Sequence, residues 1–168
     1  LVIQGRIMVN GGVDKPVIFT SLYENAATGD WQGIVLLASE KKNLIENCRV
    51  EGAETGFDAS FSKVSMKNAF FNRCRTGVRM QDSFAVMTGG GAGGCGCGLI
   101  LYDCEADIRS AVFPDNRLGI YSARTSLSLT GSRLTHNDQL ALAADACKLN
   151  ITGNSFSGNG SGLNLTGC

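Results

Sequence analysis

The feature that most constrains the fold of this chain is a repeat of about 21 residues. A small residue followed by an apolar one recurs at intervals of 23, 21, 21, 21, 22 and 21 residues. Such a period indicates a repeat architecture, in which each unit buries its apolar side against its neighbours. The seven units begin at Gly33, Gly56, Gly77, Gly98, Gly119, Ala141 and Gly162.

Each unit opens with a pattern typical of a β-strand that has one buried face. The residue after the small one is apolar, the next varies freely, and the one after that is mostly apolar again. This alternation has the period of two that a half-buried strand requires. The first apolar column consists of Ile34, Phe57, Val78, Leu99, Ile120, Leu142 and Leu163.

Two further short strands follow in each unit, with no room for a crossover helix. A period of two recurs in segments such as "LSLTG" and "LNITG", and helical periodicity appears nowhere at length. We therefore predict an all-β fold, a single-stranded right-handed parallel β-helix (solenoid) of about seven coils of ~21 residues, with three short strands per coil. Residues 1–168 form one domain, with an N-terminal strand segment and loop (1–30) before the regular coils (31–168). The chain begins without Met, and we expect it to be part of a longer protein.

Two columns of polar or small residues mark the predicted corners of the coils. Asn tolerates the left-handed backbone that a corner requires, and stacked amides can bond along the solenoid axis. The first column contains Asn116, Asn137 and Asn159 and continues back through Cys95 and Cys74. The second contains Asn47, Asn68, Gly89, Ser110, Gly131 and Gly153.

The glycine-rich stretch "TGGGAGGCGCG" (88–98) has the G-x-G-x-x-G spacing of a dinucleotide-binding loop. Such a loop must open a helix, whereas here the strand-like "LILYD" follows and the unit keeps its 21 residues. We predict that the stretch replaces the third strand of one coil, with Ala92 inward between Phe71 and Phe113. The alternative is a smooth notch that receives a ligand or a neighbouring chain.

Composition excludes several functions. Lys plus Arg and Asp plus Glu number 15 each, so no basic field is available for nucleic acid. No apolar run approaches the length of a membrane-spanning helix.

The seven cysteines lack zinc-type C-x2-C pairs. We expect buried free thiols, with a soft-metal site at Cys74, Cys95 and Cys97 as the alternative.

The segments "GRIMVNGGVDKPVIFTS", "GDWQGIVL" and "NLIENCRVEGAETGF" resemble the pectin-lyase-like right-handed parallel β-helix superfamily, in particular its bacterial exported or surface members. The resemblance implies an extracellular, periplasmic or cell-surface location. It implies the fold more specifically than the function, because the superfamily includes lyases, hydrolases, esterases and adhesins.

Enzymes of this superfamily usually work on the outer face of the first strand column and the turn after it. A calcium-dependent lyase needs carboxylates around the ion and a basic residue, and a hydrolase needs two carboxylates. The only histidine, His136, is expected at another corner. The catalytic candidates are Asp58, Arg79, Asp82 and Asp103.

A non-catalytic structural or carbohydrate-binding module is the interpretation we favour over a polysaccharide lyase or glycoside hydrolase. Exposed aromatic rings would support sugar binding, and the candidates for ligand contact are Tyr102, Tyr121 and Arg124. No cofactor is expected, with calcium needed only by a lyase. An uncapped solenoid exposes strand edges, so we also expect self-association through the ends or edges.

Overall fold

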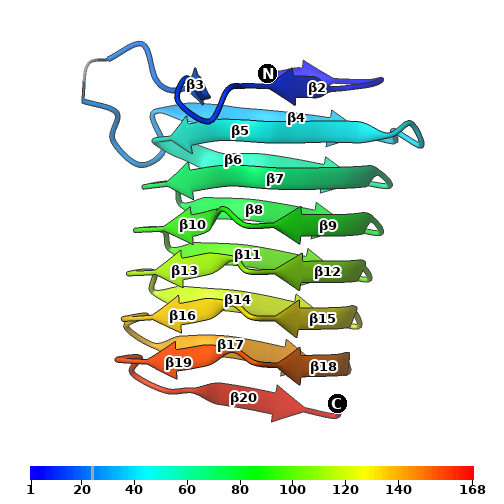
Figure 1. Cartoon of the computed structure of the whole chain (residues 1–168), viewed down its shortest axis with the longest axis vertical. Helices are drawn as coiled ribbons and strands as arrows, with labels where there is room; N and C mark the ends of the chain where they lie inside the picture. The colour runs from blue at the N-terminus through cyan, green and yellow to red at the C-terminus, as the bar shows by residue number, and fades with distance from the viewer. Residues whose placement is uncertain (24) are drawn as a thin grey trace.

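The computed structural model, which describes residues 1–23 and 25–168, is a solenoid of parallel β-strands, and its described residues form no helix (Figure 1). Two sheets run the length of the molecule. Sheet A consists of β1 (Val2–Ile3), β4 (Trp31–Leu37), β6 (Ala53–Ser60), β8 (Thr76–Gln81), β11 (Cys97–Tyr102), β14 (Leu118–Ala123), β17 (Leu140–Asp145) and β20 (Leu163–Thr166). Sheet B consists of β2 (Met8–Asn10), β3 (Val17–Phe19), β5 (Asn43–Glu51), β7 (Lys63–Asn72), β9 (Phe84–Thr88), β10 (Gly91–Gly93), β12 (Glu105–Arg109), β13 (Val112–Pro114), β15 (Ser126–Thr130), β16 (Arg133–Thr135), β18 (Lys148–Thr152) and β19 (Ser155–Ser157).

The coils wind in the predicted right-handed sense. In Figure 1 the strands of sheet B cross the front from right to left, those of sheet A return behind them, and the chain descends from the N-terminus. From β4 to β20 the chain completes about six turns, which is slightly fewer than the predicted seven. The difference arises because the unit that begins at Gly162 contributes β20 and then ends.

The strand register confirms the predicted apolar columns. In sheet A, Leu99 pairs with Ile120, and Ile120 pairs with Leu142. All three side chains are at most 1% exposed, so the interior is a continuous stack of apolar residues. Three strands per coil are seen from β8 onward. In the two coils before it, the second and third strands run together as β5 and β7, without a break at the corner.

The second predicted corner column adopts the left-handed backbone, but the first does not. Asn47 and Asn68 have φ values of 48° and 49°, as predicted. In the first column the residue before the asparagine takes this conformation, as in Asp115 (φ 57°). The reason is that the asparagine side chain points inward, where Asn116 and Asn137 are fully buried and their amides bond from coil to coil.

The glycine-rich stretch forms the third strand of its coil, as predicted. Ala92 pairs with Phe71 and is 1% exposed, and β11 rather than a helix follows β10. Gly91 needs to be glycine, because a Cβ there would lie 1.8 Å from the carbonyl oxygen of Val112. The stretch is therefore a tightly packed part of the solenoid wall.

The N-terminal segment adds a partial coil to the upper end. Strand β2 pairs with the first half of β5, and β3 pairs with the second half. The predicted loop at 24–30 includes Glu24, which lies outside the described residues. Within the rest of that loop, Ala26 is buried and the Thr28 hydroxyl donates to the carbonyl of Arg73 at 2.9 Å. Trp31 is half-buried against the core.

Candidate functional site

The outer face of sheet A carries Asp58 and Arg79 in one register column. The two residues are directly paired on β6 and β8. Arg79 Nε donates to Asp58 Oδ1 at 3.1 Å, and Nη2 donates to the second carboxylate oxygen. This hydrogen bond raises the pKa of the Arg79 guanidinium. Asp58 therefore has its oxygens engaged by a cation, and Arg79 is poorly suited to act as a base.

Asp103 and Arg124 form a second pair of this kind at the corner after sheet A. Arg124 Nε and Nη2 each donate to one oxygen of the Asp103 carboxylate at 2.7 Å. The bidentate contact lowers the pKa of Asp103 and raises that of Arg124. Both residues have φ values near 50°, so they occupy the left-handed corner position of successive coils.

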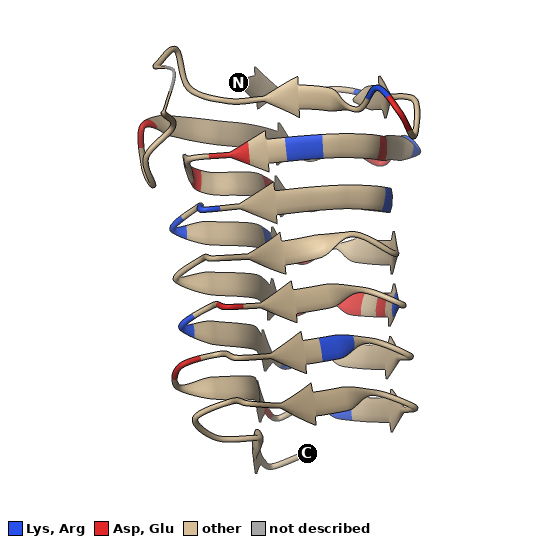
Figure 2. Cartoon of the chain, turned by 60° about the vertical axis from the view of Figure 1, so that its left-hand side comes forward, with Lys and Arg blue, Asp and Glu red and all other residues tan. Residues whose placement is uncertain are grey.

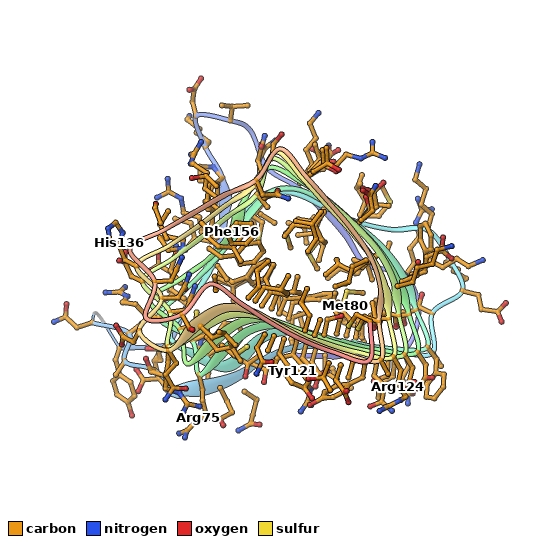
Figure 3. All side chains as sticks on the ribbon, turned by 90° about the horizontal axis from the view of Figure 1, so that it is seen from below. Arg75, Met80, Tyr121, Arg124, His136 and Phe156 are labelled. Carbon is orange, nitrogen blue, oxygen red and sulfur yellow. The ribbon has the colours of Figure 1, made fainter. Side chains whose placement is uncertain are left out.

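Tyr102 and Tyr121 contact each other on the same outer face. Their ring centroids are 5.7 Å apart with planes inclined at 57°, and both side chains are half-buried. Figure 3 shows Tyr121 and Arg124 on the outside of the solenoid and Met80 on the inside. The predicted ligand-contact residues therefore lie along one exposed surface. Tyr102 and Tyr121 lie on the two coils that carry Asp103 and Arg124, and Tyr121 shares the register column of Asp58 and Arg79.

The four catalytic candidates do not form one compact cluster. Asp58 and Arg79 lie in the middle of sheet A, whereas Asp82 and Asp103 lie at the corner, beyond the last residues of β8 and β11. Asp82 borders a different hollow, which is described below. His136 lies at another corner, away from Tyr121 and Arg124 in Figure 3.

The described residues offer no ready metal site. They contain no group of three or more His, Cys, Asp or Glu side chains placed to hold a metal ion. The soft-metal alternative at Cys74, Cys95 and Cys97 therefore finds no support. The arrangement on sheet A also lacks the ring of free carboxylates that calcium prefers.

The cysteines are free, and six of the seven are buried as predicted, with Cys168 exposed. Burial raises the pKa of Cys48 and of Cys97 to about 11. The Cys74 and Cys95 thiols interact with each other, which raises the pKa of Cys95 and lowers that of Cys74. Thiols held in the neutral form are poor nucleophiles, so Cys48, Cys95 and Cys97 are structural.

Sequence reasoning missed a second surface, at the corner between sheets A and B in the upper coils. Two adjoining hollows there share Glu40, Lys63 and Phe84, and we call them together the corner groove. Phe61 and Phe84 are 61% and 41% exposed. The available signal was the first repeat interval, which has 23 residues where most others have 21.

Charges of both signs are scattered over the coils (Figure 2). None of the described residues belongs to a helix long and apolar enough to cross a membrane.

Residues 1–69 match a family described as the pectate-lyase like beta helix domain. The parallel coils and this match confirm the predicted resemblance to the pectin-lyase-like superfamily.

Among curated proteins, none matches the chain significantly. One solved structure is similar at 13% identity, over 93% of this chain and 73% of that chain, with a TM-score of 0.31. It is a trypsin-treated variant of QnrB1, described as "a plasmid-mediated fluoroquinolone resistance protein". Neither its fold nor its function is carried over to this chain.

Proposed function

We propose that this protein is a non-catalytic, polysaccharide-binding β-helix module of an exported bacterial protein. The observation that carries the proposal is the Tyr102–Tyr121 pair on the outer face of sheet A. Aromatic rings offer apolar faces to sugar rings, and their hydroxyls offer hydrogen bonds at the same place. Arg79 and Arg124 flank the pair and keep N–H donors near it.

The ion pairs favour binding over catalysis. A lyase would need Arg79 or a neighbouring base to lose a proton, yet the contact with Asp58 raises the pKa of Arg79. A hydrolase would need one carboxyl group with a raised pKa to serve as the acid, whereas the pKa of Asp103 is lowered by Arg124. The outer face therefore suits contact with a chain of sugars better than its cleavage.

Retention on insoluble polysaccharides tests the binding proposal. The double variant Tyr102→Ala, Tyr121→Ala should lose retention on any polysaccharide that holds the wild-type protein. Tyr23→Ala is the matched control, because Tyr23 is 68% exposed and lies in the N-terminal segment. Equal retention of the double variant and the wild type would contradict the proposal.

The proposal includes self-association of this chain through its last coil. Leu163 and Leu165 of β20 occupy inward register positions but are each 45% exposed. Covering these side chains and the free edge of β20 with a second copy would bury apolar surface and satisfy backbone groups. Sedimentation should show association that weakens in Leu163→Lys, Leu165→Lys. A concentration-independent monomer would count against it.

A further inference from the structure

The corner groove owes its shape to an insertion in one coil. Strand register shows that the stretch from Leu37 to Asn43 is two residues longer than the equivalent stretch from Ser60 to Val64. The additional residues extend the corner at Glu40–Lys42, and the extended loop beside β5 is visible in Figure 1. Insertions in solenoid repeats map to loops on one face, which is often the binding face.

A buried asparagine anchors this loop. Asn43 is fully buried, and its Nδ2 donates to the carbonyls of Lys41 at 2.8 Å and Lys63 at 2.9 Å. Its Oδ1 accepts a hydrogen bond from the backbone N–H of Ile7 at 2.9 Å. The loop is thus tied both to the next coil and to the N-terminal segment. A site held in this way is organised before any ligand arrives.

The larger hollow of the groove has a volume of about 360 Å³, which is within the range of small-molecule sites. Its surface is mostly apolar and includes the exposed ring of Phe84 and the outward side chain of Val86. The amide of Asn43 is already used within the protein, so few fixed polar groups remain for a ligand. The lining residues are Glu40, Lys42, Asn43, Lys63, Val64, Ser65, Phe84 and Val86.

The larger hollow is lined by two ammonium groups, from Lys42 and Lys63, and one carboxylate, from Glu40, which leaves one positive charge in excess. The other carboxylate of the groove, Asp82, lines only the smaller hollow. Lys63 is paired in register with Phe84, and Lys42 directly precedes Asn43, the partner of Val64. The two lysines therefore come from successive coils, and both line the hollow. Within the part of the chain that the structure describes, neither lysine forms an ion pair. An excess of one positive charge beside an apolar ring is complementary to a ligand that carries both an apolar body and an anion.

We infer that the corner groove binds a small organic anion, with an aromatic body against Phe84 and a carboxylate between Lys42 and Lys63. The inference is independent of the polysaccharide contacts proposed for sheet A. The polymer would meet a flat outer face, whereas this ligand enters a hollow at the corner of the first coils.

Titration of ¹⁵N-labelled protein with 3-phenylpropionate, followed by NMR, tests this inference. Amide shifts should concentrate at Lys63, Phe84 and Val86. Lys63→Gln and Phe84→Ala should each weaken binding by about tenfold or more. Both side chains are exposed, so the variants should keep the urea midpoint of the wild type.

Matched controls separate the groove from general surface effects. Lys148→Gln removes a lysine from the same outward column several coils away, and Phe70→Ala removes another exposed ring. Both should bind as the wild type does. The neutral analogue 3-phenylpropanamide and acetate should each bind about tenfold more weakly, because one lacks the charge and the other lacks the ring.

Three results would overturn the inference. They are equal binding of the amide and the carboxylate, unchanged affinity in Lys63→Gln, and shifts that map outside the groove. Tighter binding of an acidic oligosaccharide at the same residues would overturn the ligand class. Loss of polysaccharide retention in the sheet A variants would leave this inference unaffected.

Discussion

Replacement of Asn137 by alanine should destabilise the solenoid strongly, because this side chain connects three coils. Asn137 Nδ2 donates to the carbonyl of Phe113 at 3.0 Å and to Asn159 Oδ1 at 2.8 Å, and its Oδ1 accepts from the N–H of Asn116 at 3.1 Å. The side chain is fully buried, so water cannot replace these bonds.

The magnitude follows from the groups that lose their partner. The Asn116 N–H and the Phe113 carbonyl each lose a bond in the interior, and an unsatisfied buried group costs roughly 1–3 kcal/mol. The free energy of unfolding should therefore fall by about 4 kcal/mol, out of the roughly 5–15 kcal/mol of a typical domain.

Urea unfolding followed by circular dichroism provides the assay. The control is Asn150→Ala, since Asn150 is exposed on sheet B and should change stability by less than about 0.5 kcal/mol. A loss below about 1 kcal/mol in Asn137→Ala would refute the reasoning. It would mean that the bonds between coils contribute little compared with apolar burial.

Two further predictions follow from packing and ionisation. Gly77→Ala should lower the free energy of unfolding in urea by about 1–3 kcal/mol, because a Cβ there would lie 2.5 Å from the carbonyl oxygen of Gly98. Gly162→Ala is the control and should leave it unchanged, because a Cβ at Gly162 meets nothing within 4 Å. Equal effects of the two would contradict this. The thiols of Cys48 and Cys97 have pKa values raised from 9.0 to about 11, so their stabilisation is complete below pH 9 and is lost as the pH rises to 11. The urea midpoint of the wild-type protein should fall between pH 9 and pH 11, and the fall should be smaller in the double variant Cys48→Ala, Cys97→Ala. An equal fall in the double variant would mean that the loss of stability does not come from these two thiols.

The sequence predicted the fold well because stacking imposes one period on every column. Leu99, Ile120 and Leu142 lie one coil apart in sequence and become direct neighbours in sheet A. The same counting placed Ala92 inside the wall despite the surrounding glycines. The period gives the position of a residue within its coil, but it does not determine whether a side chain at a corner points inward or outward. The inward direction of Asn116 was missed for this reason.

The surface was less predictable than the core. Asp58 and Arg79 were placed correctly on the outer face, but only the structure shows that they are paired with each other. Phe61 and Phe84 were not among the predicted ligand-contact residues, for which the aromatic candidates were Tyr102 and Tyr121. The insertion at Glu40–Lys42 lengthens one repeat interval by two residues. The length of an interval does not show that the inserted loop creates a groove.

The central claim is that the outer face of sheet A holds polysaccharide without cutting it. The most direct test incubates the protein with a polysaccharide panel, with and without calcium, and measures both bound protein and newly formed unsaturated or reducing ends. We predict retention without new ends for the wild-type protein and for Asp103→Asn. New ends released by the wild-type protein and abolished in Asp58→Asn or Asp103→Asn would contradict the claim.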